Sequence, residues 1–60
     1  MSFKELHGKK VKIVYDHLGR EKAVYGILLS DDINSFKLRF TSGDIVGISK
    51  HHFIRISEEG

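Results

Sequence analysis

The sequence contains no cysteine, no proline and no tryptophan among its 60 residues. Without cysteine the chain cannot form a disulfide, and this composition fits a reducing compartment. No apolar run reaches the ~18 to 20 residues of a membrane-spanning helix, and no segment has the pattern of a secretory signal peptide. These absences exclude a disulfide-stabilised mini-protein, and we expect a cytoplasmic protein with no membrane contact.

The length and charge of the chain limit what it can do alone. We expect one domain over 1–60, in which folding buries only about 60% of the surface of the unfolded chain. Ten Lys and Arg residues against eight acidic residues give a net charge of +2, which permits a polyanionic partner without requiring one. Because so small a core is marginal, we expect the chain to associate with itself.

A short helix is predicted at the start of the chain, over 2–7. Ser2 and Glu5 have the spacing of a capping box, and Gly8 follows where a left-handed residue often ends a helix. One or two turns are not stable alone. We therefore expect Phe3 and Leu6 to dock on the rest of the domain.

From Lys9 onward, the hydropathy pattern changes to a period of two, which is typical of half-buried strands. In the first strand this period places Val11, Ile13 and Tyr15 on one face. The predicted strands are 9–16, 21–30, 36–40, 45–49 and 53–57, followed by a tail at 58–60. Gly26 lies inside the second strand and predicts a bulge or a sharp bend. Short connections make neighbouring strands antiparallel. We therefore predict a mainly β fold with a five-stranded, strongly bent antiparallel sheet. This sheet would form a small barrel over 9–57, and closure of the barrel would leave few open edges.

The order and spacing of these features resemble the Sm-like family, which includes the LSm proteins and the bacterial Hfq type. The first family motif has a glycine after strand one, a second glycine within strand two and an aspartate six residues later, as Gly19, Gly26 and Asp32 do here. The turn between the last two strands contains Lys50-His51, similar to the Lys-His pair of the bacterial branch. The resemblance covers nearly the whole chain.

The resemblance implies a small barrel of the Sm-like or SH3-like kind that forms a homo-oligomeric ring. Strand 45–49 of one subunit would pair with strand 53–57 of the next. The ring would bind short single-stranded RNA, rich in U or A, without a cofactor. It would influence RNA pairing, stability or regulation.

Two groups of polar residues are the candidate RNA-binding residues. Lys50, His51 and His52 would form a cluster of cationic and hydrogen-bonding groups at the pore of a ring, where they would contact phosphates and base edges. Asn34 would read a base edge, while Asp32 orders its own loop through backbone N–H groups. For both groups, the alternative is that these polar residues only form their turns and face water. A metal site is not expected, because neighbouring side chains in a tight turn point apart.

The remaining cations and the tyrosines allow two further interpretations. Lys37 and Arg39 share the outer face of the sheet with Lys10 and Lys12, which is either a solvated face or a surface for nucleic acid. Tyr15 and Tyr25 each lie on an apolar strand face. For them we expect core or interface packing, with base stacking as the alternative. Phe36, Phe40 and Phe53 are expected in the core.

Three other functions compete with RNA binding as interpretations of the sequence. A triad of His51, Asp32 and a serine is conceivable, but no nucleophile lies in a suitable motif and there is no glycine-rich phosphate loop, so we do not expect an enzyme. An SH3-like protein-interaction module is the main rival. The sequence lacks the tryptophan and the acidic aromatic groove that proline-rich ligands prefer. A protein that coats duplex DNA through Lys37 and Arg39 is the third.

Overall fold

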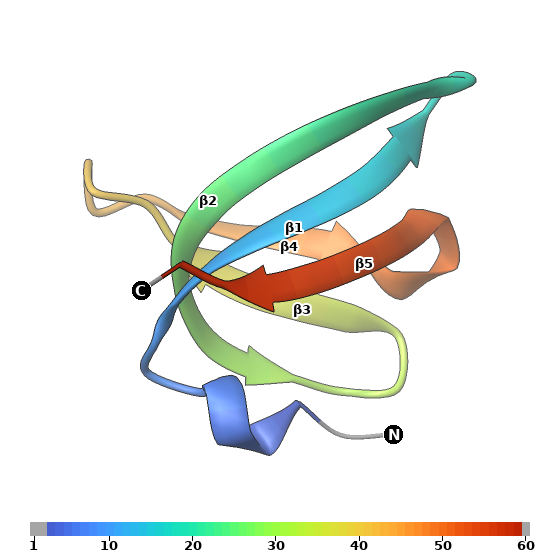
Figure 1. Cartoon of the computed structure of the whole chain (residues 1–60). Helices are drawn as coiled ribbons and strands as arrows, with labels where there is room; N and C mark the ends of the chain where they lie inside the picture. Colours follow the sequence, from blue (N-terminus) through green and yellow to red (C-terminus); the bar gives the residue numbers. More distant parts are fainter. Residues whose placement is uncertain (1–2, 60) are drawn as a thin grey trace.

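The computed structural model of the protein describes residues 3–59 and contains one five-stranded antiparallel sheet with the strand order β4-β3-β2-β1-β5 (Figure 1). In chain order the elements are η1 (Lys4–Leu6), β1 (Lys10–His17), β2 (Arg20–Asp31), β3 (Ser35–Arg39), β4 (Ile45–Ser49), η2 (Lys50–His52) and β5 (Phe53–Glu58). The predicted mainly β, five-stranded antiparallel architecture is confirmed.

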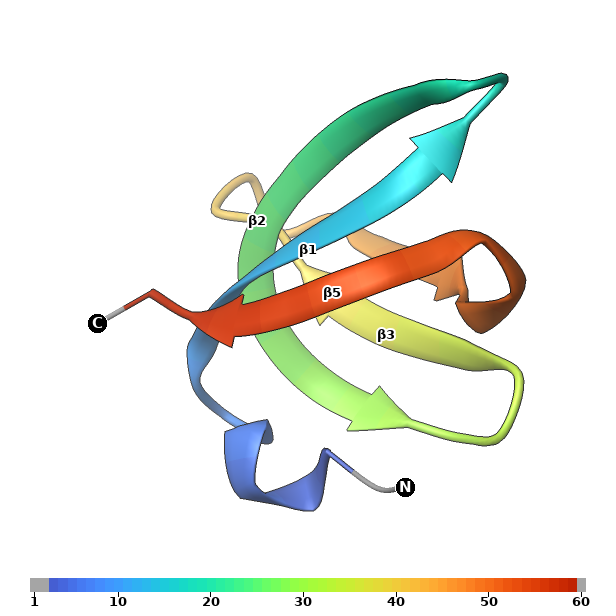
Figure 2. The same cartoon turned by 45° about the vertical axis from the view of Figure 1, so that its right-hand side comes forward.

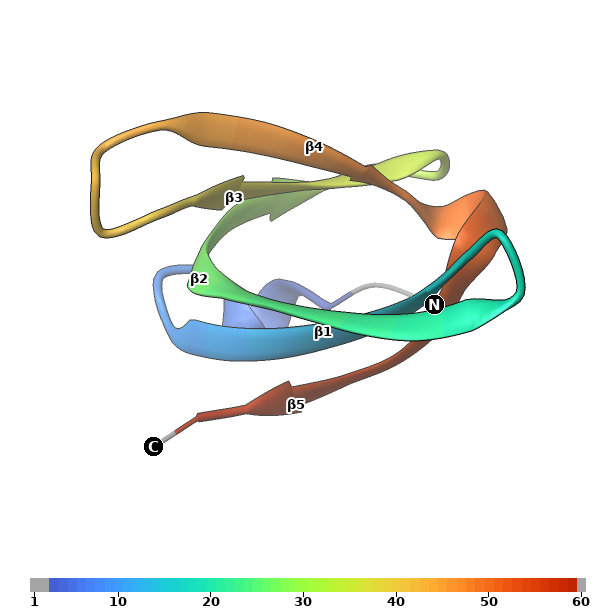
Figure 3. The same ribbon diagram turned by 90° about the horizontal axis from the view of Figure 1, so that it is seen from above.

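The long strand β2 bends and connects the two halves of the sheet. Viewed from above, β3 and β4 lie on one side and β1 and β5 on the other, with β2 passing between them (Figure 3). Ile27 pairs with β1 and is also the first β2 residue that pairs with β3. At the preceding position, Gly26, a Cβ atom would lie 2.9 Å from the carbonyl oxygen of Arg39. β2 therefore changes partner next to Gly26, where the close approach of Arg39 requires a residue without a side chain, while the bulge in the pairing with β3 lies between Leu28 and Ser30.

The predicted barrel is not closed. β4 pairs with β3 and β5 pairs with β1, and no strand of the described chain covers their other edges. The physical reason lies in η2, whose three residues direct β5 away from β4 and across to β1. The expectation that closure would limit open edges was therefore wrong.

The predicted N-terminal helix is a single 3-10 turn, Lys4–Leu6. Phe3 precedes it without a capping side-chain hydrogen bond, and three residues are too few for an α-helical turn to persist. Ser2, and with it the proposed capping box, lies outside the described residues. Gly8 has φ +83°, as predicted for a left-handed residue after the turn.

The hydrophobic core lies inside the bend of the sheet. Phe3 and Leu6 pack against it from the N-terminal turn, as predicted. The rings of Phe3, Phe36 and Phe53 form a cluster with centroids 5.0 to 5.8 Å apart. The residues of the core that are fully buried are Val11, Ile13, Leu28, Phe36 and Leu38. Phe40 was expected in the core but is only half-buried beside Gly26.

The first half of β1 follows the predicted period of two, with Val11 and Ile13 buried, but the second half does not. Val14 is buried, whereas Tyr15 is only half-buried. The pairing of β1 with β5 shifts register between these two residues, and such a bulge changes which side chains face inward. Tyr25 on β2 is 49% exposed, so it does not pack in the core, and the expectation of interface packing stays a prediction.

We predict that Gly26→Ala destabilises the domain by about 1–3 kcal/mol, because the added methyl group collides with the backbone of Arg39. For a domain of this size, each kcal/mol lowers the melting temperature by about 4–8 °C. Thermal unfolding followed by circular dichroism measures the change.

The matched control is Gly47→Ala. Gly47 is exposed, and its added methyl group would meet only the carbonyl oxygen of Phe36, at 3.9 Å. This variant should stay within about 0.5 kcal/mol of the parent. Equal losses in both variants would show that the bend does not depend on glycine.

Candidate nucleic-acid site

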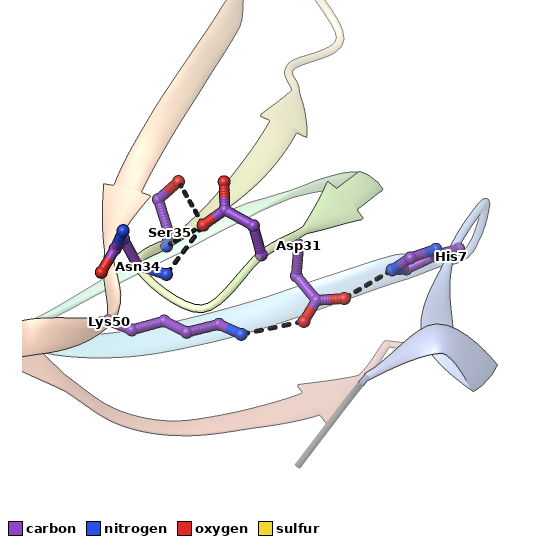
Figure 4. Close-up of polar contacts among 6 residues, drawn as sticks. His7, Asp31, Asn34, Ser35 and Lys50 are labelled. Atoms are coloured by element: carbon purple, nitrogen blue, oxygen red, sulfur yellow. Dashed lines mark hydrogen bonds and ion pairs between the residues drawn. The ribbon is translucent and has the colours of Figure 1, made fainter.

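A carboxylate at the end of β2 connects three separate parts of the chain (Figure 4). The Asp31 side chain is 5% exposed. Its Oδ1 lies 2.6 Å from His7 Nε2, next to the N-terminal turn, and its Oδ2 accepts a hydrogen bond of 2.8 Å from Lys50 Nζ in η2. Asp31 therefore holds the N-terminal segment and the η2 turn against the end of β2.

Lys50 is directed into the domain rather than into solvent. Its side chain is 18% exposed, and its Nζ lies 4.9 Å from the centroid of the Phe36 ring and 5.4 Å from that of the Phe3 ring. Cation–π contacts of this kind add to the ion pair. The ammonium predicted to contact RNA is thus engaged with Asp31 in this structure, and its contact with phosphate stays a prediction.

Asp32 orders the loop between β2 and β3. Its Oδ1 accepts hydrogen bonds from the backbone N–H groups of Asn34, at 2.7 Å, and Ser35, at 2.8 Å. In the same loop, the Asp32 N–H donates to the carbonyl oxygen of Ser35. This is the loop-ordering role predicted for Asp32, and it fixes the backbone that presents Asn34 to solvent.

The β2–β3 loop and the η2 turn meet directly. The backbone N–H of Lys50 donates to the carbonyl oxygen of Asn34 at 2.8 Å. Beside this bond lies an open hollow of about 290 Å³, whose lining includes Ile33, Asn34, Ser49 and His51. We call this hollow the turn site.

The turn site brings together most of the residues predicted from the sequence. Asn34, Lys50 and His51 line it, and Asp32 holds the adjoining loop. His52 does not belong to it: it lines a different hollow, together with Tyr15 and His17 on β1. The rings of His51 and His52 meet edge to face with centroids 4.9 Å apart. The two histidines nevertheless line different hollows.

Hydrogen bonding keeps both aspartates of this region ionised. The Lys50 ammonium, followed by His7, lowers the pKa of Asp31 below its ordinary value of 3.8 despite the opposing effect of burial. The backbone N–H groups of Asn34 and Ser35 lower the pKa of Asp32. Both carboxylates are thus negative at neutral pH, so the turn site is not purely cationic.

The sequence alone did not reveal Asp31 or His7 as part of this arrangement. The spacing from Gly26 indicates Asp32, but it is the neighbouring Asp31 that pairs with Lys50. His7 is 24 residues from Asp31 in the chain, and no local pattern indicates that contact. The adjacent pair Asp31-Asp32 before a loop was the only available signal.

No family model, no curated protein and no solved structure matches this chain. Within residues 3–59 no helix is both long and apolar enough to cross a membrane. In the same range, no three His, Asp or Glu side chains are grouped as the ligands of a metal ion would be.

We predict that Asp31→Asn lowers the free energy of unfolding by about 3 kcal/mol at neutral pH, because the Lys50 ammonium loses its buried counter-ion. The unfolded chain takes up a proton at Asp31 near pH 3.8, whereas the lowered pKa keeps the folded chain ionised further into acid. The stabilisation from Asp31 is therefore present above pH 3.8, and it is lost as the pH falls through the lowered pKa of the folded state. Urea unfolding of both proteins from neutral to acidic pH should show the difference closing at the acid end.

Two controls accompany this prediction. Asp16→Asn removes an exposed carboxylate that forms no ion pair within the described chain, and it should change stability by less than about 0.5 kcal/mol at neutral pH. Lys50→Met should cost less in the Asp31→Asn background than in the parent, because the pair is already broken. Additive losses would mean that the two side chains do not interact.

Proposed function

We propose that this protein is an RNA-binding protein of the Sm-like type, which forms a homo-oligomeric ring and binds short single-stranded RNA rich in U or A. In this role it influences RNA pairing, stability or regulation. One observation carries the proposal. The two open edges of the sheet belong to β4 and β5, and the η2 turn between these strands adjoins the polar turn site.

The open edges support assembly between copies. An exposed strand edge presents unpaired N–H and C=O groups that bind another strand. Exposed apolar side chains lie on both edge strands: Ile45 on β4 is 59% exposed and Ile54 on β5 is 42% exposed. Pairing β4 of one copy with β5 of the next satisfies both edges in one contact. Such head-to-tail contacts form a ring when the rotation closes.

A ring multiplies the turn site. Each copy contributes the amide of Asn34 and the imidazole of His51, which form hydrogen bonds with the edges of unstacked bases. Lys50 supports these groups by holding η2 against Asp31, and a phosphate contact of Lys50 would require it to leave that ion pair. Repetition around the ring turns a weak single contact into useful affinity.

We predict that the purified protein is an oligomer and that Ile45→Lys with Ile54→Lys converts it to a monomer with the same circular dichroism spectrum. Charges on exposed edge positions oppose strand pairing without entering the core. Light scattering at micromolar concentration measures the mass.

Leu18→Lys is the matched control for assembly, because Leu18 is strongly exposed in the β1–β2 turn, away from both edges. This variant should keep the mass of the parent. A monomeric parent protein would overturn the ring and favour the protein-interaction module.

We predict that Asn34→Ala and His51→Ala each weaken binding of fluorescent oligouridine or oligoadenosine by about three- to tenfold, the loss expected for one hydrogen bond. Fluorescence anisotropy measures the affinity, and light scattering checks that the variants still assemble. His52→Ala provides the comparison, because His52 lines the other hollow, and it should lose less. Equal affinities in all three variants and the parent would show that the turn site does not bind the RNA.

A further inference from the structure

A second hollow, larger than the turn site, lies at the bend of β2. It has a volume of about 560 Å³, and its lining includes Lys10, Tyr25, Ile27, Arg39 and Phe40. Figure 2 shows the β3–β4 turn beside the bend of β2, where this hollow lies. We call it the bend cleft. Its lining includes no residue of the edge strands β4 and β5, which are the strands that the assembly proposed above would pair.

Two cations flank the bend cleft. Ile27 pairs with Lys10 on one side and with Arg39 on the other, so the three residues form a row across β1, β2 and β3. Cross-strand neighbours of this kind share one face of a sheet. Lys10 and Arg39 are both exposed, and the cleft therefore has a positive group on each side.

The charges of these two cations are not compensated inside the domain. Lys9, Arg55 and Lys50 each form an ion pair with a carboxylate. Lys10 and Arg39 form none within residues 3–59, and none of the described residues that line the cleft is acidic. Glu59, whose backbone N–H donates to the carbonyl oxygen of Lys10, and Asp44, which follows Gly43, lie beside the cleft but do not line it. An anion in the cleft would meet a positive group on each side.

Aromatic rings supply the apolar part of the cleft. The half-exposed side chain of Tyr25 lies on β2, next to Lys12, whose Nζ is 5.9 Å from the ring centroid. On the other side, Phe40 lies against Gly26, where a Cβ atom would be 3.4 Å from the ring. An exposed aromatic ring bordered by cations is the combination that stacks an unpaired base and holds its phosphate.

We propose that the bend cleft binds one nucleotide unit of a single-stranded nucleic acid, with the base stacked on Tyr25 and the phosphates contacted by Lys10 and Arg39. A single strand fits better than a duplex, because the bases of a duplex are stacked on each other and their faces cannot reach Tyr25. The site lies apart from the turn site and does not depend on ring formation. The bend cleft is a second contact for a strand bound at the turn site, or a contact for a second strand.

The first test locates binding residue by residue. The protein labelled with ¹⁵N is titrated in turn with oligouridine, oligoadenosine, the free nucleotides UMP and AMP, and a short duplex DNA. The oligonucleotides should shift the backbone amide signals of Tyr25, Ile27 and Arg39, and the free nucleotides should shift the same signals more weakly. Tighter binding of free nucleotides than of oligonucleotides would overturn the assignment to a strand, and equal binding of duplex would overturn base stacking.

The location of the shifts separates this proposal from the turn site. Shifts confined to Asn34 and His51 would overturn the bend cleft and leave the proposed function standing. Shifts confined to Tyr25, Ile27 and Arg39 would support binding at the bend cleft and exclude binding at the turn site. No shift with any oligonucleotide would overturn both.

Matched variants provide the second test. Tyr25→Ala should weaken binding of the oligonucleotides at least about fivefold, whereas Tyr25→Phe, which keeps the ring, should bind as the parent does. Arg39→Gln should lower the dependence of log affinity on log salt by about 0.7, the effect of one lost phosphate contact on a single strand. Its control is Lys37→Gln, which removes the same charge from an exposed position two residues away on β3 that does not line the cleft.

These variants distinguish a site from general charge attraction. All four variants change side chains outside the buried core, at three positions, and melting curves check that each variant folds. Equal losses of affinity in Arg39→Gln and Lys37→Gln, together with no loss in Tyr25→Ala, would reduce the cleft to part of a solvated basic face and overturn the proposal.

Discussion

The ion pair between Asp31 and Lys50 is the interaction on which the arrangement of the turns depends. Removing a carboxylate from water costs several kcal/mol unless a counter-ion and hydrogen bonds replace the water. Lys50 and His7 supply these partners from two distant segments. The buried charge therefore requires that the N-terminal turn, the end of β2 and η2 meet at one place. The position of the turn site follows, because η2 and the β2–β3 loop are held together there.

The bend of β2 is the second constraint, and it separates the two candidate surfaces. Gly26 allows the backbone of Arg39 to approach, which curves the sheet around the core. Inside the bend lie the buried side chains, and beside it lies the bend cleft with Tyr25 and two cations that form no ion pair within residues 3–59. β4 and β5 remain the open edges of this curved sheet, because η2, between them in the chain, directs β5 across to β1. Assembly and both proposed contacts with RNA thus depend on a sheet that curves without closing.

The strands could be predicted from the sequence because alternation of apolar and polar residues is a local signal. Phe36, Leu38 and Val11 are buried as that period requires, and Gly26 marks the bend. The period failed at Val14 and Tyr15, because a bulge in the pairing with β5 shifts the register. The N-terminal helix was overestimated, because a capping pattern does not supply the length that a helix needs.

By itself, the sequence determined which segments form strands, where the chain turns and where β2 bends, since each depends on neighbouring residues. It also determined that Asp32 caps its own loop. Only the tertiary structure decided that Lys50 points inward to Asp31, that His51 and His52 face different hollows, and that Tyr25 lies exposed between cations. These features depend on residues far apart in the chain, and no local pattern encodes the distance between two side chains that only folding brings together.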